Sequence, residues 1–140
     1  MRIALCLSGQ PRSFAATYDG YLKYIFPLGS VDIFCHFWES DKTVPALELY
    51  KPKAFKVEKQ IDFEKIKNWR AADYGNVTNA PSMFYGIKEV FELKQQVELD
   101  NNFSYDFAIR SRTDNMFNGE IQLSRCKPNL LYLPDLTEWD

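Results

Sequence analysis

Short apolar runs recur along this chain, and most of them end in polar or turn-forming residues. The first run, Ile3 to Leu7, is followed by Ser-Gly-Gln-Pro-Arg, which is typical of a buried strand that ends in a tight loop. The same pattern predicts further strands over residues 31–38, 54–58, 106–111 and 129–134. We therefore expect these runs to build the central sheet of the protein.

Apolar residues at helical spacing lie between several of these runs. One helix is predicted over 13–26, with Ser13 as its N-terminal cap. The longest helix is predicted over 82–100, where apolar residues form one face. Shorter helical segments are indicated over 46–50 and 63–71. Because strands alternate with helices, we expect an α/β fold with a mostly parallel central sheet and flanking helices.

Polar residues gather where three of the predicted strands end. They are Ser8 to Arg12 after the first strand, His36 with Trp38-Glu39 at the end of the second, and Arg110 to Asn115 after the strand over 106–111. Ligands of open α/β sheets bind in the crevice outside the carboxyl ends of the strands. Within a single sheet, these three loops are expected to converge.

Length and composition narrow the class of protein. With 140 residues, 46% of them hydrophobic, the chain is expected to form one soluble domain over residues 1–140. A net charge of -2 with dispersed basic residues gives no general nucleic-acid surface. Cys6, Cys35 and Cys126 are odd in number and widely spaced, and two of them lie in predicted strands, which favours reduced, buried thiols in a cytoplasmic protein. The first apolar run is too short for a signal peptide or a membrane span.

The loop from Ser8 to Arg12 is a candidate anion site. Gly9 would let the backbone approach a ligand closely, the amides at the start of the next helix could face a phosphate, and Arg12 would add charge. The alternative is a plain turn, and the two are about equally probable from this segment alone. The common phosphate-binding patterns GxGxxG and GxxxxGK[ST] are absent from the sequence.

Asp114 is a candidate metal ligand. A carboxylate at a strand end suits Mg²⁺ or Mn²⁺, which keep several waters and take further ligands from a diphosphate. The alternative, favoured by spacing alone, is that Asp114 caps the next turn or pairs with Arg110 or Arg112. Asp106 lies at the opposite end of the predicted strand, too far away to share this site.

His36 and Tyr85 each allow a structural and a functional interpretation. His36 is the only histidine and has apolar neighbours in sequence, so a hydrogen-bonded structural role is favoured over catalysis. Tyr85, in the early turns of the longest predicted helix, faces either the crevice or the core, and the core is favoured.

Four segments together, 3–12, 31–38, 82–87 and 105–114, resemble the GT-A-type glycosyltransferase-like domains found in bacterial and viral surface-polysaccharide gene sets. The resemblance extends over most of the chain. It implies a Rossmann-like half that binds a nucleotide-diphosphate sugar, with the Arg112-Thr-Asp114 loop where GT-A enzymes carry Asp-x-Asp. In this chain Arg112 replaces the first Asp of that motif.

The resemblance also implies roles for individual residues. Asp114 would hold Mn²⁺ or Mg²⁺, or a guanidinium would itself neutralise the departing diphosphate. The residues implied in substrate binding lie in the three loops and at the start of the long helix: Ser8, Gly9, Gln10, Arg12, Ser82, Tyr85, Arg110 and Arg112.

The implied activity is transfer of a sugar from the nucleotide to a glycan or protein acceptor. GT-A enzymes carry their acceptor-binding part and catalytic base after the strand that corresponds to residues 130–133, so the fold is expected to be incomplete at its C-terminal end. The alternative is an inactive GT-A-like module that docks a partner enzyme or a second copy. A phosphatase-like enzyme is disfavoured because the sequence has no nucleophile motif.

Overall fold

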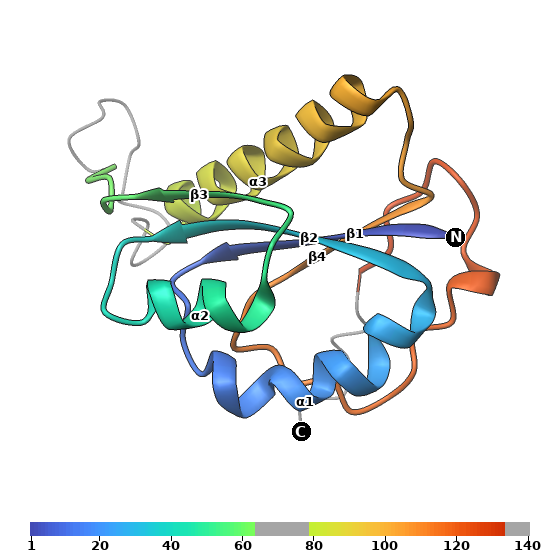
Figure 1. Cartoon of the computed structure of the whole chain (residues 1–140), viewed down its shortest axis with the longest axis horizontal. Coiled ribbons are helices and arrows are strands. Elements are labelled where there is room, and N and C mark those ends of the chain that lie inside the picture. The colour runs from blue at the N-terminus through green and yellow to red at the C-terminus, as the bar shows by residue number, and fades with distance from the viewer. Residues whose placement is uncertain (64–78, 134–140) are drawn as a thin grey trace, which may run out of the picture.

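The computed structural model describes residues 1–63 and 79–133, and within them a single sheet forms the centre of the molecule (Figure 1). The strands are all parallel and lie in the order β3-β2-β1-β4. Their bounds are β1 Arg2–Gly9, β2 Ser30–Trp38, β3 Ala54–Glu58 and β4 Phe107–Ser111. The predicted α/β class and parallel sheet are confirmed.

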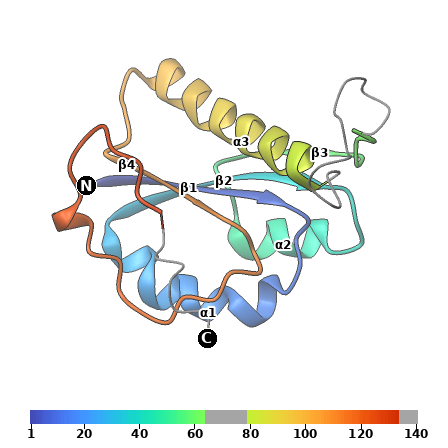
Figure 2. The ribbon, with the colours of Figure 1, turned by 180° about the vertical axis from the view of Figure 1, so that it is seen from behind.

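Helices cover both faces of the sheet. Helices α1 (Phe14–Tyr24) and α2 (Thr43–Tyr50) lie on one face, and the long helix α3 (Asn79–Asn101) lies on the other, as the two opposite views in Figures 1 and 2 show. Two single-turn 3₁₀ helices, η1 (Phe26–Leu28) and η3 (Leu123–Arg125), lie in the connections. None of the helices in the described part of the chain is long and apolar enough to cross a membrane.

The central strand β1 supplies side chains to two separate cores. Leu5 and Leu7 pack with α1 and α2, whereas Ala4 and Cys6 pack beneath α3, because successive residues of a strand point to opposite faces. All four side chains are fully buried. A strand that is covered on both faces has a continuous apolar sequence, which explains why the run from Ile3 to Leu7 has no polar alternation.

The order of the strands defines where a ligand site is expected. From β1 the chain moves outward through β2 to β3, and α3 then returns it to β4 on the other side of β1. The direction of winding therefore reverses between β1 and β4. In open α/β sheets the crevice for ligands lies at this reversal, outside the carboxyl ends of the two strands.

The prediction of a strand over 129–134 is wrong for residues 129–133, the part that the structure describes. Residues 129–133 form no strand, and the side chains of Leu130, Leu131 and Leu133 are 60%, 85% and 77% exposed. An apolar run predicts a strand only if a neighbouring strand is free to bond with it, and none of the described strands does so here.

The helix predictions hold with two qualifications. Ser13 adopts a left-handed conformation with φ of 50° and makes no side-chain cap, so the predicted capping is wrong. Its backbone carbonyl instead accepts hydrogen bonds from the amides of Ala16 and Thr17. The helical segment predicted over 63–71 lies, apart from Phe63, outside the described residues.

The cysteines are free thiols. Cys6 and Cys35 are buried in the two cores, and Cys126 is partly exposed. Burial raises the pKa of Cys6 to about 12, so this thiol stays protonated and unreactive at neutral pH. The expectation of reduced, buried thiols is confirmed for these two strand positions.

Candidate functional site

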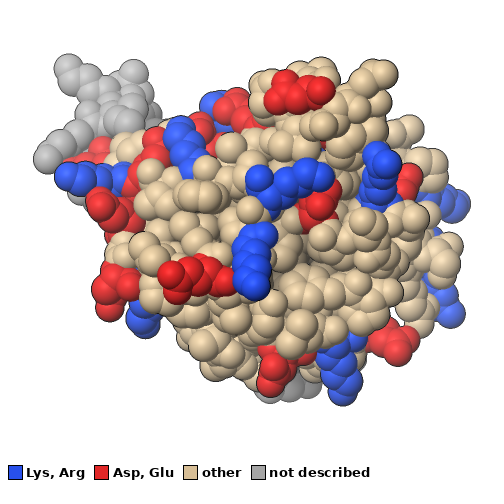
Figure 3. Space-filling model, in the orientation of Figure 1, with Lys and Arg blue, Asp and Glu red and all other residues tan. Residues whose placement is uncertain are grey.

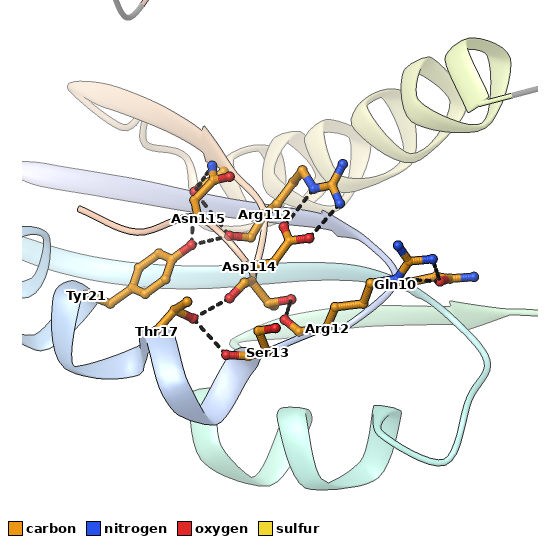
Figure 4. A network of polar contacts seen from close by, with 10 residues as sticks. Gln10, Arg12, Ser13, Thr17, Tyr21, Arg112, Asp114 and Asn115 are labelled. Atoms are coloured by element: carbon orange, nitrogen blue, oxygen red, sulfur yellow. Dashed lines mark hydrogen bonds and ion pairs between the residues drawn. The ribbon is translucent and has the colours of Figure 1, made fainter. Parts of the chain in front are cut away.

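The loops that follow β1 and β4 meet at the carboxyl edge of the sheet, the edge where the parallel strands end (Figure 4). Thr113 Oγ1 donates a 3.0 Å hydrogen bond to the backbone carbonyl of Arg12. Thr17, in the first turns of α1, donates its hydroxyl hydrogen to the carbonyl of Thr113. Both threonines are buried, so these bonds fix the two loops against each other at the point where the winding reverses.

Tyr21 of α1 forms hydrogen bonds with the end of β4 and the loop that follows it. Its side chain is fully buried, its hydroxyl donates to the carbonyl of Arg112, and the same oxygen lies 2.9 Å from Ser111 Oγ. Asn115 Nδ2 donates to Ser111 Oγ over 3.0 Å. Burial raises the pKa of Tyr21 to about 12, so the hydroxyl remains a donor at any physiological pH. The course of the loop around Arg112 is therefore set by buried groups.

Arg112 and Asp114 form a bidentate ion pair on this loop (Figure 4). Arg112 Nε donates to Asp114 Oδ1 over 2.8 Å, and Nη2 donates to Oδ2 over 2.7 Å. Burial would raise the pKa of Asp114, but hydrogen bonds from Arg112 and its charge outweigh burial and hold the pKa below its usual value. The alternative in which Asp114 pairs with a neighbouring arginine is thus the arrangement in the structure.

Positive charge exceeds negative charge at this place. Three guanidiniums, those of Arg12, Arg110 and Arg112, act on one another or on the single carboxylate of Asp114. Arginine stays charged in proteins, so two positive charges are left unbalanced within this group of side chains. On the face shown in Figure 3, by contrast, acidic and basic residues are interspersed. The positive excess therefore concerns the side chains at the carboxyl ends of β1 and β4.

Arg110 contributes a donor that has no protein acceptor. Its Nε is buried and has no hydrogen-bond partner among the described residues. Burial, and after it the neighbouring charge of Arg112, lower the pKa of Arg110 from its usual value. A buried N–H without an acceptor is energetically costly, and an anionic ligand would relieve that cost.

A divalent cation does not fit the donor set around Asp114. Mg²⁺ and Mn²⁺ require several oxygen ligands, and each oxygen of the Asp114 carboxylate already accepts a hydrogen bond from Arg112. Within residues 1–63 and 79–133, no three His, Cys, Asp or Glu side chains lie close enough to hold a metal ion together. The chemistry of the loop suits an anion better than a cation.

A second polar cluster lies at the same edge, beneath the first half of α3. His36 is fully buried, and its Nε2 lies 2.8 Å from Oε2 of Glu58 at the end of β3. Tyr85 donates its hydroxyl to the same oxygen over 3.1 Å, and Lys56 Nζ lies 3.2 Å from Oε1. The ring of Tyr85 stacks on Trp38 with 5.8 Å between centroids. We call these five residues the His36 cluster.

The carboxylate of Glu58 accepts a hydrogen bond from His36. Burial opposes ionisation of Glu58, but hydrogen bonds from His36, Lys56 and Tyr85 hold its pKa below the usual value. Facing an ionised carboxylate, His36 Nε2 donates the proton of this hydrogen bond. Nδ1 is buried and has no hydrogen-bond partner within the described part of the chain. The structural role favoured for His36 agrees with this burial and bonding.

The structure divides the predicted site residues between these two places. At the carboxyl ends of β1 and β4 lie the strand residues Gly9 and Arg110 and the loop residues Gln10, Arg12, Arg112 and Asp114, whereas Ser8, Ser82 and Tyr85 lie near the start of α3.

Gly9 and Ser8, adjacent in sequence, illustrate the division. Gly9 has φ of 113°, a conformation that side chains disfavour, so glycine is needed at this turn. Ser8 points to the opposite side, where a Cβ at Gly86 of α3 would lie 3.5 Å from its Cβ and 3.3 Å from His36 Nδ1. Gly86 therefore allows α3 to pack closely over both residues, and Ser8 is only 5% exposed.

Tyr85 and Ser82 lie at the rim of this packing. Tyr85 is partly buried, and its ring packs against the buried side chains of His36 and Trp38, outside the two apolar clusters. Ser82 Oγ accepts a 3.0 Å hydrogen bond from Gln60 Nε2. Neither residue contacts Arg112 or Asp114 through a described hydrogen bond, so their predicted role in substrate binding stays a prediction.

Glu58 was not among the residues that the sequence indicated, and its importance can be measured. Glu58→Ala is expected to lower the free energy of unfolding by about 1–3 kcal/mol, because His36 Nε2 is left buried without an acceptor. Glu58→Gln keeps an oxygen acceptor and should lose clearly less. Urea denaturation of both variants measures the difference, and equal losses would show that the His36 contact does not matter.

Comparisons with known proteins assign this chain to no family and no function. No protein-family model, no curated protein and no solved structure matches this chain. Function must therefore be inferred from the charge and geometry at the carboxyl edge.

Proposed function

We propose that this chain binds a nucleotide-diphosphate sugar and is a GT-A-type glycosyltransferase-like domain that transfers the sugar to a glycan or protein acceptor. The single observation that supports this proposal most is the positive excess at the reversal between β1 and β4. Among the described residues, Arg12, Arg110 and Arg112 have one carboxylate, that of Asp114, acting within their group. A diphosphate is a small ligand with enough negative charge to balance them.

The chemistry of glycosyl transfer gives these charges a use. The bond between the sugar and the diphosphate breaks more easily when cations stabilise the charge that develops on the leaving group. Guanidiniums do this through charge-assisted, often bidentate hydrogen bonds to phosphate oxygens. The buried Nε of Arg110 has no acceptor among residues 1–63 and 79–133, and the side chain of Arg112 is 45% exposed. In this proposal Arg112 contacts the phosphate from the solvent side, and Arg110 Nε gains an acceptor once the ligand lies against it.

The order of the strands supports the same location. The loops of β1 and β4 lie on either side of the reversal, and the buried bonds of Thr113 and Tyr21 fix their backbones in place. Groups held in position before the ligand arrives stabilise charge without reorganising. In this proposal the sequence Arg112-Thr-Asp114 occupies the place of the Asp-x-Asp motif of GT-A enzymes.

A second candidate function is an inactive GT-A-like module that docks a partner. The specific observation in its favour is the exposed apolar segment from Leu130 to Leu133, where each side chain is at least 51% exposed. Exposed apolar side chains in succession are typical of interaction surfaces. This candidate predicts association that does not depend on nucleotide.

Calorimetry with UDP, GDP and dTDP tests the proposed function, with the corresponding nucleosides as controls that lack the diphosphate. We expect one diphosphate to bind, and we expect its affinity to fall as salt is raised, because the attraction is between charges near the surface. The nucleosides alone should bind much more weakly. If no diphosphate binds at low salt, the proposed function is wrong.

A further inference from the structure

The ion pair between Arg112 and Asp114 lies at the surface of the candidate site. The side chain of Arg112 is 45% exposed and that of Asp114 is 24% exposed. Exposed ion pairs contribute little to stability, because water and salt screen the attraction and two side chains must be held in one geometry. A ligand with more negative charge than one carboxylate can therefore compete for Arg112.

Asp114 reduces the positive potential that an anion would meet. Among the described residues its carboxylate is the acidic group that acts on Arg110 and Arg112, and it partly offsets their mutual repulsion. Arg12 also acts on Asp114 through its charge. Neutralising Asp114 would leave all three guanidiniums unopposed within the group.

We propose that Asp114 is an internal counter-ion of Arg112, which a diphosphate displaces, and that the site binds the diphosphate without a divalent cation. The proposal rests on the proposed function, since it concerns the same diphosphate site. In the free protein Asp114 holds the guanidinium of Arg112 over the loop, in the orientation drawn in Figure 4. When the diphosphate binds, its oxygens take the place of the two carboxylate oxygens, and Asp114 turns to solvent.

The counter-ion role and a metal-binding role predict opposite effects of Asp114→Asn on the affinity for the diphosphate. If Asp114 held a metal ion that bridged to the diphosphate, Asp114→Asn would weaken binding and a chelator would abolish it. If Asp114 is a competing anion, Asp114→Asn strengthens binding and a chelator has no effect. The asparagine has nearly the same size as the aspartate, so packing is little changed.

The test is calorimetry with inorganic pyrophosphate in EDTA and again with excess MnCl₂. Asp100→Asn is the matched control, because Asp100 is an exposed aspartate at the far end of α3. We expect wild-type protein to bind pyrophosphate in EDTA. Asp114→Asn should bind about threefold to tenfold more tightly, the size expected for removing one like charge near a surface anion. Asp100→Asn should match the wild type.

The outcomes separate the two proposals. Binding that requires Mn²⁺, or that weakens in Asp114→Asn, would overturn the counter-ion role and leave the diphosphate site standing. The comparison of EDTA with MnCl₂ uses wild-type protein and so does not depend on how the variant folds. If pyrophosphate and nucleoside diphosphates both fail to bind with or without Mn²⁺, the diphosphate site itself is refuted.

Discussion

Replacing Tyr21 with Ala is expected to lower the free energy of unfolding by about 3–5 kcal/mol, the usual loss for a large aromatic side chain in a core. The ring is fully buried and makes edge contacts with Tyr50 and Phe117, with centroids 5.5 Å and 4.9 Å away. The substitution also leaves the carbonyl of Arg112 without its buried donor. A domain of this size is commonly stable by only about 5–15 kcal/mol, so urea denaturation should show the change clearly.

Two further variants separate the ring from the hydroxyl. Leu22→Ala removes a neighbouring side chain that is 48% exposed, and should change stability much less than Tyr21→Ala. Tyr21→Phe keeps the ring and should lose about 1–3 kcal/mol, because Ser111 and Arg112 lose a buried partner. A loss for Tyr21→Ala no larger than that for Leu22→Ala would mean that α1 is not packed on the sheet as described.

Replacing Arg112 with Gln is expected to weaken binding of pyrophosphate by about 10-fold to 100-fold, the range expected for losing a charge-assisted hydrogen bond. The effect has two parts. A guanidinium that would contact the phosphate is lost, and the carboxylate of Asp114 is released from its ion pair to repel the anion. Calorimetric titration in EDTA measures the loss directly.

A double substitution tests whether loss of the guanidinium and repulsion by the Asp114 carboxylate both contribute to the weaker binding. Arg112→Gln combined with Asp114→Asn removes both charges, so it should bind more tightly than Arg112→Gln alone. Arg125→Gln is the control for general charge, because Arg125 lies on η3, near the N-terminal ends of the strands (Figure 1). If Arg125→Gln weakens binding as much as Arg112→Gln, the attraction is nonspecific and not confined to the loops.

The sheet could be predicted from the sequence because its strands are buried. The runs around Leu5 and Phe34 are apolar on both faces, and such runs are distinct from helical periodicity. The run at 129–134 looked similar in sequence but forms no strand over its described residues. Apolar content alone does not indicate whether a strand partner exists, since that depends on the rest of the fold.

The candidate site was only partly predictable. Arg110, Arg112 and Asp114 lie within five residues of one another at the end of β4, so their proximity is a local property of the sequence. The contact between His36 and Glu58 depends instead on the register of β2 with β3, in which His36 is opposite Lys56 and Trp38 is opposite Glu58. No local signal in the sequence specifies that register.

The placement of Ser8 shows the same limitation on a smaller scale. It was grouped with Arg12 because the two residues are close in sequence, yet its side chain faces α3 and lies near His36. Consecutive strand residues point to opposite faces, so proximity in sequence does not place two side chains in one site. Ser8 directly follows Leu7, whose side chain packs with α1 and α2, so the alternation of strand residues would have predicted that Ser8 faces α3.

The most direct test of the central claim is a titration of the protein with UDP, followed by NMR of the arginine Nε–Hε groups. The account predicts that the signals of Arg12, Arg110 and Arg112 move on addition of the diphosphate, with Arg110 Nε gaining the acceptor that it lacks within the described part of the protein. The signals of Arg2 and Arg125, away from the carboxyl edge, should stay in place. If Arg12, Arg110 and Arg112 do not respond, or if Arg2 and Arg125 respond equally, the diphosphate is not bound at the reversal between β1 and β4.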